Sequence, residues 1–356
     1  MTVKPVWLDF ARRLLAWAGC WLATFSWAAP PAPVTLRVVG GLGELNQYTQ
    51  FEEPFWTKRL PEATQGRFTA EIVPFNKAGI RGQDMLSLVH QGALPIGTVL
   101  LSMGTPKDLE LSAPDLAGVN PDMASLKRSM AAFRPFLQAR LKERFGLELL
   151  AVYVYPAQVM FCKGPWAAED NGLKGRRVRT SSASQSDFVQ ALGGTAMLTP
   201  FSEVVGQLKS GNLDCAITGT MSGNTVGLHE VTTHLHPMAI NWGLSMVVAN
   251  GVAWAGIPAD MQTLLRRELN LLEIAIWDAA ERETLDGFAC NTGSPRCKGG
   301  RLGHMVALKP GAQDDPKRRE VLKNTVLPNW LQRCGPACAD VWNRTLAKDS
   351  GVVAKP

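Results

Sequence analysis

The hydrophobic and polar positions of this chain follow two periods, one typical of β-strands and one typical of α-helices. Alternating or β-branched runs predict strands, and apolar residues spaced three and four apart predict amphipathic helices. In the first third of the chain these patterns predict a strand at 34–39, a helix at 48–63, a strand at 68–73, a helix at 84–90 and a strand at 96–101. A β-α-β-α-β order of this kind opens a parallel α/β lobe.

The same alternation restarts in the middle of the chain. A helical stretch at 124–145 and an apolar, strand-rich segment at 147–162, which Pro156 interrupts, come first. The pattern then predicts a strand at 177–179, a helix at 185–192, a strand at 197–198, a helix at 202–209 and a strand at 213–217, after which 239–249 leads back out. We therefore predict a second α/β lobe.

The longest predicted helix covers 258–289, with Pro258 in its first turn. Its apolar residues recur at helical spacing, and a helix of about 30 residues is ~45 Å long. That length is enough to cross two lobes. A further helical stretch at 318–347 forms the tail of the chain.

The first 28 residues are expected to be a secretory signal peptide. Lys4, Arg12 and Arg13 precede an apolar run at 14–27, which is too short to span a membrane, and small residues precede a cleavage site after Ala28. The mature protein is then exported and lies in the periplasm. We predict 1–28 as signal peptide, 29–152 as lobe I with a return segment at about 242–275, 153–241 as lobe II with about 276–310, and 311–356 as a C-terminal helical tail.

The formal net charge of the chain is +6. Removal of the signal peptide leaves a mild positive excess that is spread along the chain, which is compatible with an anionic ligand. No basic stripe with interleaved aromatic residues is present, so nucleic acid is not an expected partner.

Six cysteines remain after cleavage, and export makes disulfides possible. Cys290 and Cys297 flank a turn-like run, and Cys334 and Cys338 flank a second short loop, so we predict two local disulfides. Neither pair has the spacing of a zinc site. Whether Cys162 and Cys215 pair or stay as thiols is left open by the sequence.

Three motifs follow one another at characteristic spacings: the run 172–179 (GLKGRRVR), the run 188–194 (FVQALGG) and the run 200–214 (PFSEVVGQLKSGNLD). This ordered set, from about residue 34 to 290, resembles the DctP-like solute-binding proteins of TRAP (tripartite ATP-independent periplasmic) transporters. The resemblance implies a two-lobe α/β periplasmic binding protein fold, type II-like, with a long helix spanning both lobes. It also implies two partners, a small organic acid and the integral membrane subunits of the transporter.

The resemblance carries one ligand-binding residue over directly. The last Arg of the 172–179 motif pairs with the substrate carboxylate in that family, and here it is Arg179. A guanidinium is always charged and presents parallel N–H donors that fit a carboxylate. Its neighbours Arg176 and Arg177 are interpreted as solvated or structural.

Five further residues are predicted to line the ligand site, and several depart from the family pattern. Gln158 lies where many members have a second Arg, and Thr218 lies where they have Asn. Tyr155 and Trp242 can supply an aromatic wall, although ordinary packing is the alternative for both, and Asn46 can donate to the ligand from the loop after the first strand. The loss of a second cation favours a monocarboxylate.

Two motifs point to other chemistry and are weaker. Gly41-Leu-Gly43 suggests a dinucleotide loop, but the third glycine position is Asn46. His229, Glu230 and His234 resemble a metalloprotease motif, but their spacing puts the two histidines on different helix faces. We interpret 229–236 as a polar connecting segment.

The chain shows no convincing catalytic constellation, so binding is favoured over catalysis, and neither a cofactor nor a metal is expected. Two alternatives remain open. The same fold can serve a sensor kinase, which a gene neighbourhood that encodes two membrane subunits would distinguish from transport. A secreted metal-dependent hydrolase would show stoichiometric zinc.

Overall fold

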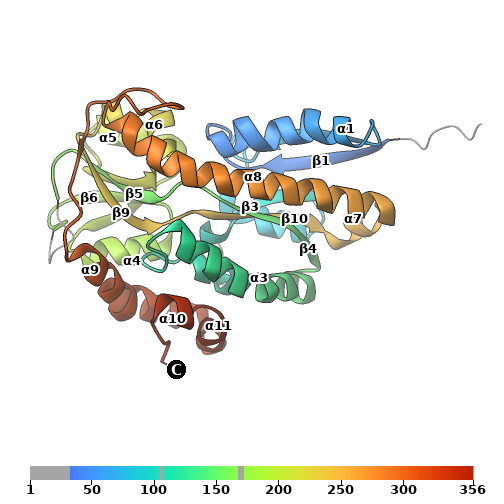
Figure 1. Cartoon of the computed structure of the whole chain (residues 1–356). Helices are drawn as coiled ribbons and strands as arrows, with labels where there is room; N and C mark the ends of the chain where they lie inside the picture. Colours follow the sequence, from blue (N-terminus) through green and yellow to red (C-terminus); the bar gives the residue numbers. More distant parts are fainter. Residues whose placement is uncertain (1–32, 104–107, 167–171, 356) are drawn as a thin grey trace, which may run out of the picture. The chain divides into compact units, whose positions relative to one another are not determined.

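The structure, a computed structural model, describes residues 33–103, 108–166 and 172–355 (Figure 1). The predicted signal peptide at 1–28 lies outside the described residues. Within the described ranges the chain forms two β-sheets flanked by helices, which confirms the predicted α/β class.

The first sheet has five strands in the order β2-β1-β3-β10-β4. They are β1 (Val34–Gly40), β2 (Phe68–Pro74), β3 (Ile96–Leu100), β4 (Leu147–Val154) and β10 (Leu244–Asn250). β1 pairs in parallel with β2 and β3, as the sequence pattern predicts, and β10 runs antiparallel to β3 and β4. The connecting helical segments are η1 (Gln47–Glu52), η2 (Phe55–Arg59), α1 (Leu60–Ala63) and α2 (Met85–His90).

The second sheet has six strands in the order β11-β9-β5-β8-β6-β7. They are β5 (Gln158–Cys162), β6 (Arg177–Thr180), β7 (Thr195–Leu198), β8 (Cys215–Gly219), β9 (His234–Asn241) and β11 (Val306–Ala307). β6 is parallel to β7 and β8, and β5 is antiparallel to β8 and β9. Its helices are α4 (Ala183–Ala191), α5 (Val204–Lys209) and α6 (Thr220–Val226).

The interpretation of 229–236 as a polar connection is wrong at its carboxyl end. β9 begins at His234, which pairs with Cys162 on β5, while His236 pairs with Met160. His236 is buried, and its ring lies 4.4 Å from the ring of Trp166. The ring of His236 can be buried in this strand because its Nδ1 accepts the backbone N–H of Met238 at 3.1 Å and Trp166 covers its face.

Two short linkers carry the chain from one sheet to the other. Residues 155–157 join β4 to β5, and residues 242–243 join β9 to β10. The lobe boundaries at 152 and 241 stay predictions, and residues 153–154 belong to β4 of the first sheet. The two linkers hydrogen-bond to each other, because the backbone N–H of Tyr155 donates to the carbonyl of Gly243 at 3.2 Å.

The long helix α8 (Ala259–Asn291) runs along both sheets (Figure 1). Among the apolar residues at helical spacing, Leu265, Leu269, Leu272 and Ile276 are fully buried, whereas Leu264 is only partly buried. Midway, the Glu273 carboxylate accepts the backbone N–H of Val152 on β4 at 2.9 Å. The short helix α7 (Gly251–Ala255) precedes α8.

Near its carboxyl end α8 lies very close to α6, at Gly287. A Cβ at this position would lie 2.4 Å from the backbone N of Met221 and 2.5 Å from the carbonyl carbon of Thr220. We expect Gly287→Ala to lower the free energy of unfolding by about 1–3 kcal/mol, because backbone atoms cannot yield as a flexible side chain does.

A matched glycine lies on α5, where a Cβ at Gly206 would meet nothing within 4 Å. We expect Gly206→Ala to raise the free energy of unfolding by about 0.4–1 kcal/mol. Urea denaturation of both variants measures the difference, and equal stabilities would contradict the close approach of α8 to α6.

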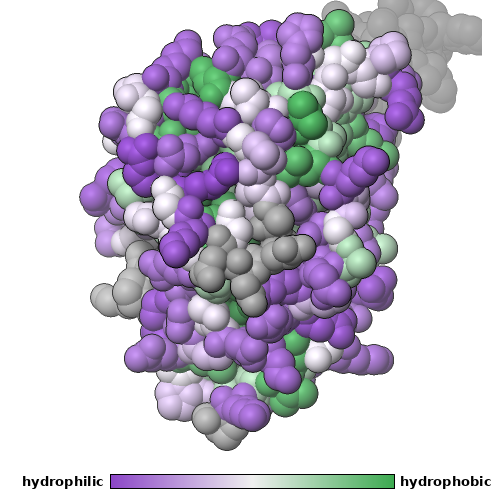
Figure 2. Space-filling view, turned by 90° about the vertical axis from the view of Figure 1, so that its left-hand side faces the viewer, coloured by the Kyte–Doolittle hydropathy of each residue, from purple (hydrophilic) through white to green (hydrophobic). Residues whose placement is uncertain are grey.

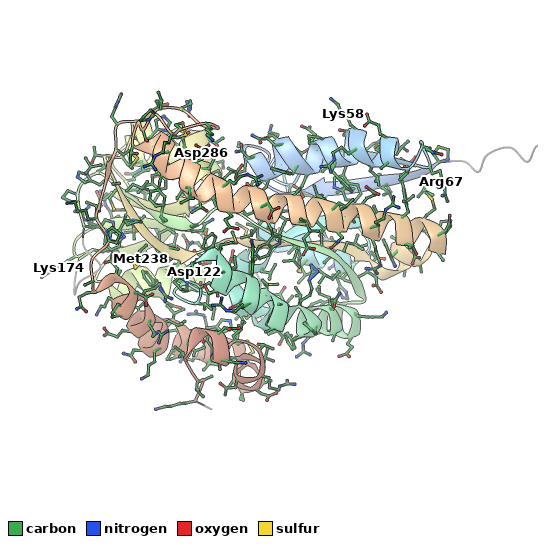
Figure 3. All side chains as sticks on the ribbon, viewed as in Figure 1. Lys58, Arg67, Asp122, Lys174, Met238 and Asp286 are labelled. Carbon is green, nitrogen blue, oxygen red and sulfur yellow. A yellow bond between two sulfur atoms is a disulfide. The ribbon has the colours of Figure 1, made fainter. Side chains whose placement is uncertain are left out.

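The C-terminal tail packs beside the second sheet and the long helix α3 (Met123–Phe145). It contains α9 (Asp314–Val321), η8 (Leu322–Val326), α10 (Leu327–Cys334), α11 (Ala337–Thr345) and α12 (Ala347–Ser350). Arg333 forms an ion pair of 2.6 Å with Asp187 on α4. The indole of Trp330 donates to the carbonyl of Leu109 at 3.1 Å, in the turn η5 (Leu109–Asp115). Figure 3 labels Asp122, which caps the amino end of α3.

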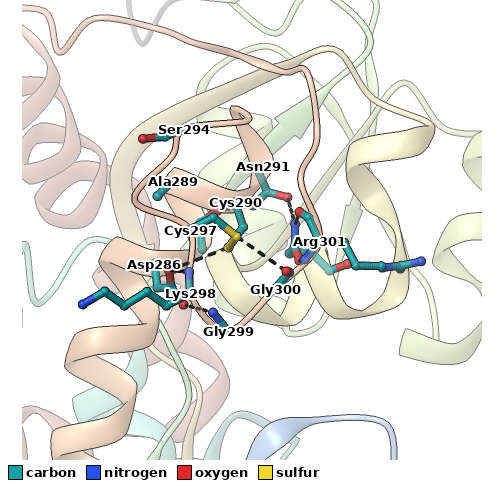
Figure 4. The surroundings of a disulfide bond; sticks show 12 residues. Asp286, Ala289, Cys290, Asn291, Ser294, Cys297, Lys298, Gly299, Gly300 and Arg301 are labelled. Carbon is teal, nitrogen blue, oxygen red and sulfur yellow. Dashed lines mark hydrogen bonds between the residues drawn. A yellow bond between two sulfur atoms is a disulfide. The ribbon is translucent and has the colours of Figure 1, made fainter.

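Three disulfides join the six cysteines of the described residues. The two pairs expected from the sequence are Cys290–Cys297 and Cys334–Cys338, and the third joins Cys162 to Cys215, which the sequence left open. Around Cys290–Cys297 the Asp286 carboxylate accepts the backbone N–H groups of Lys298 and Gly299, each at 2.7 Å (Figure 4). This carboxylate fixes the loop that follows α8.

In the described ranges, no helix combines the length and the apolar character that crossing a bilayer requires. The end of the molecule that carries the second sheet is covered mostly by hydrophilic residues, with small and separate hydrophobic patches (Figure 2).

Candidate functional site

Arg179 is a buried cation on β6, with 3% of its surface exposed. Its Nε donates to the carbonyl of Thr199 at 3.0 Å, and its Nη1 donates to the carbonyl of Ile217 on β8 at 2.8 Å. The ring of Phe201 lies 5.8 Å from the guanidinium carbon. These contacts hold the guanidinium plane and leave Nη2 without a hydrogen bond to any described residue.

No carboxylate among the described residues pairs with Arg179. Burial lowers the pKa of Arg179 to about 10, because it disfavours the charged form. A buried charge without a counter-ion is costly for a folded protein. The position is suited to an external anion, since Arg179 lies at the carboxyl ends of parallel strands, where ligands bind in open α/β sheets.

The linker 155–157 contacts the carboxyl ends of strands from both sheets. A Cβ at Gly41, just after β1, would lie 2.9 Å from Oη of Tyr155. A Cβ at Gly219, the last residue of β8, would lie 3.2 Å from the carbonyl oxygen of Pro156, and the N–H of Thr220 donates to the carbonyl of Ala157 at 3.1 Å. The strand ends of the two lobes therefore meet at this linker.

Three of the predicted site residues lie at or beside the linker. Gln158 pairs with Gly219 on β8 and with Asn241 on β9, and its Nε2 lies 2.9 Å from where a Cβ of Gly243 would be. Thr218 is buried on β8, and neither its hydroxyl nor the amide of Gln158 makes a hydrogen bond to the described residues. Oη of Tyr155 and Oγ of Ser245 are buried close to each other.

The two other predicted site residues already use their side-chain donors within the protein. Nε1 of Trp242 donates to the carbonyl of Asn120 at 3.0 Å, which fits the packing role that the sequence left open. Nδ2 of Asn46 donates to Glu283 on α8 at 2.8 Å. Their contact with a ligand stays a prediction.

Arg176 and Arg177 have the structural roles expected of them. Arg177 forms an ion pair of 2.9 Å with Asp214, which holds the pKa of that carboxyl below its ordinary value. Arg176 donates to the carbonyls of Gly164 and Pro165. Of the three neighbouring arginines, Arg179 alone is buried.

Two buried carboxylates beside the linkers were missed by the sequence analysis. Glu52 is fully buried and accepts the backbone N–H of Gly41 at 2.7 Å and the hydroxyls of Thr98 and Tyr153. Burial raises the pKa of Glu52, against the opposing effect of these three donors. Nothing in the local run 51–55 (FEEPF) marks one of its two acids as internal.

The second missed carboxylate, Asp115, binds the linker between β9 and β10. It accepts the backbone N–H groups of Trp242, Gly243 and Leu244 at 2.9–3.1 Å and the side-chain amide of Asn241 at 3.2 Å. Gly243 has φ +71°, a conformation that favours glycine and lets successive N–H groups converge on one anion.

The loop at Gly41-Leu-Gly43 does not present its glycine N–H groups to a phosphate. Gly41 donates to Glu52, and Gly43 donates to Asn76 at 3.1 Å. Among the described residues, the one group of three His, Cys, Asp or Glu side chains with ligand atoms mutually within 4.8 Å is Asp286, Cys290 and Cys297. Its cysteines form a disulfide, and the histidines at 229 and 234 are not part of such a group.

Comparison with known families and structures agrees with this fold. The model of bacterial extracellular solute-binding protein family 7, DctP, matches residues 45–288. No curated protein matches the sequence.

Solved structures share the arrangement at low sequence identity. DctP7, a Bordetella pertussis extracytoplasmic solute receptor binding pyroglutamic acid, is 21% identical, with a TM-score of 0.74, over 88% of this chain and 99% of its own. A TRAP periplasmic solute binding protein from Desulfovibrio salexigens with bound orotic acid is 17% identical, with a TM-score of 0.74, over 89% and 98%. One from Rhodoferax ferrireducens with bound malonate is 17% identical, with a TM-score of 0.73, over 89% and 98%.

These likenesses confirm the predicted two-lobe fold of a periplasmic binding protein. The match to the family model covers more than half of the chain. The chain therefore belongs to family 7 of the bacterial extracellular solute-binding proteins, the DctP family of TRAP transporters.

Proposed function

We propose that the protein is the periplasmic solute-binding component of a TRAP transporter. It captures a small organic acid through an ion pair between Arg179 and the ligand carboxylate, and it delivers the acid to the membrane subunits. The membership of the extracellular DctP family and the signal peptide predicted at 1–28 support the location.

The observation that carries this proposal is the buried and unpaired guanidinium of Arg179. Its Nε and one N–H of Nη1 are used by backbone carbonyls, so one N–H of Nη1 and both of Nη2 stay available. The Nη1–Nη2 edge is a fork that fits the two oxygens of a carboxylate. An anion there supplies the counter-charge that the protein lacks.

The ligands of structurally similar proteins agree with an acid. Those ligands include pyroglutamic acid in DctP7, orotic acid in the Desulfovibrio salexigens protein and malonate in the Rhodoferax ferrireducens protein. All are small organic acids, although their skeletons differ. The two linkers and the long helix α8 give this fold the connections of a hinge, so closure of the lobes over the ligand is the expected motion.

A thermal-shift screen of mature protein against small organic acids tests the proposal. An acid at about 100 times its Kd adds about 2.7 kcal/mol to the free energy of unfolding. We expect at least one acid to raise Tm of the wild type. In Arg179→Ala its affinity should fall by about 2–5 kcal/mol, because a charge-assisted contact is lost, and the shift should vanish.

Arg177→Ala is the matched control, since it removes the same charge two residues earlier on β6. Its partner is Asp214 and not the ligand, so the shift should persist. Arg179→Lys keeps the charge without the fork and should recover only part of the affinity. The proposal fails if no acid shifts the wild type, or if Arg179→Ala responds as the wild type does.

A further inference from the structure

The region around the two linkers contains more buried negative than positive charge. Arg179 and Arg318 are the buried arginines of the described residues, and no described lysine is buried. Arg318 is paired with Asp315 at 2.7 Å, so Arg179 is the one buried arginine of the described residues without a carboxylate partner. One guanidinium fork accommodates one carboxylate.

A buried anion lies on the lobe I side of the linker 155–157. Glu52 is held by the N–H of Gly41, and Gly41 lies against Oη of Tyr155 in that linker. The Glu52 carboxylate accepts hydrogen bonds only from uncharged groups, namely two hydroxyls and one backbone amide. No described lysine or arginine pairs with it. This arrangement solvates a carboxylate without neutralising its charge.

A second buried anion lies on the other linker. Asp115 receives N–H donors from Asn241 to Leu244, again without a lysine or arginine among its partners. A Cβ at Gly243, which Asp115 binds, would lie 2.9 Å from Nε2 of Gln158 and 3.5 Å from the side chain of Tyr155. Because charges interact over long distances in a protein interior, both anions disfavour further negative charge beside the linkers.

We infer that the site selects an acid with one carboxylate and an uncharged or positively charged remainder, and that Glu52 is the specificity-determining residue that disfavours a second carboxylate. This inference rests on the proposed function, in which Arg179 binds the first carboxylate. A neutral amide or carbonyl group can face the side chains of Gln158 or Thr218, which make no hydrogen bond to the described residues. A second carboxylate would face no free buried cation.

Three probes of nearly equal size test this selection on the wild-type protein. Succinate, succinamate and 4-aminobutyrate each carry a carboxylate at one end, and at the other end a carboxylate, an amide and an ammonium group. By titration calorimetry we expect succinamate to bind at least tenfold more tightly than succinate, and 4-aminobutyrate also to bind more tightly than succinate. The diamide succinamide, which has no carboxylate, should not bind.

Glu52→Gln tests the residue itself, and Glu53→Gln is the control, because Glu53 is adjacent and exposed. In Glu52→Gln the preference for succinamate over succinate should shrink at least fivefold, whereas Glu53→Gln should keep the wild-type ratio. If Glu52→Gln fails to fold, the order of affinity of the three probes for the wild type still reports the sign of the charge near the group opposite their shared carboxylate.

Two outcomes overturn the inference and leave the proposed function intact. The first is that the wild type binds succinate as tightly as both other probes. The second is that a folded Glu52→Gln variant keeps the wild-type ratio of the affinities for succinamate and succinate. A wild type that binds no acid of the wider panel overturns the proposed function instead.

Discussion

Asp115→Ala is expected to lower the free energy of unfolding by about 3 kcal/mol or more, because a buried donor left without an acceptor costs about 1–3 kcal/mol. Three consecutive backbone N–H groups and one side-chain amide lose their acceptor together. Relief of the buried charge offsets part of this cost. For a protein of this size we expect Tm to fall by about 4 °C or more, measured by calorimetry.

Two further variants make this result specific. Asp115→Asn keeps one acceptor oxygen and should give an intermediate loss. Asp340→Ala removes a carboxylate that is 65% exposed and paired with Arg344, so its effect should stay within about 1 kcal/mol. Equal stabilities of Asp115→Ala and Asp340→Ala would show that Asp115 does not hold the linker.

Asp115 also connects stability to binding. The linker it holds carries Gly243, which donates to Asp115 and accepts the N–H of Tyr155 from the other linker. Loss of the hydrogen bonds to Asp115 should therefore weaken ligand affinity, even if the Asp115→Ala variant still folds. A variant that loses stability and keeps its affinity would separate the two roles.

The regular elements could be predicted from the sequence, because their signals are local. The apolar residues of α8 recur at the helix period, and those of the strands recur at the strand period. Arg179 lies in a motif with fixed spacing. The strand β9 was not predicted at its start, because His234 and His236 are polar, and only their pairing with β5 makes them part of a sheet.

The buried carboxylates could not be predicted, because their partners are distant in sequence. Glu52 meets Thr98 and Tyr153, and Asp115 meets the linker at 242–244. A single acid in an apolar run has no periodic signal, so its burial depends on donors that the fold brings together. For the same reason the sequence did not show that the side-chain amide of Asn46 and the indole N–H of Trp242 donate hydrogen bonds within the protein.

Removal of the disulfide between Cys162 and Cys215 is expected to have the second large effect. It joins directly opposed residues of β5 and β8 that are 53 positions apart in sequence. In the chain-entropy model a cross-link that closes a loop of this length is worth about 4 kcal/mol. The closed loop contains Arg179 and Thr199, whose carbonyl accepts from Nε of Arg179, so ligand affinity should fall as well.

The double variant Cys162→Ala with Cys215→Ala tests this prediction by urea denaturation, and the loop of Cys334 and Cys338 supplies the comparison. Those cysteines are 4 positions apart, so the same model gives about 2 kcal/mol for their removal. The loop that this disulfide closes contains no predicted ligand residue, so removal of the disulfide should leave ligand affinity unchanged. Similar losses of stability in the two double variants, or unchanged affinity without the 162–215 bond, would contradict its role in holding β5 and β8 in place beneath Arg179.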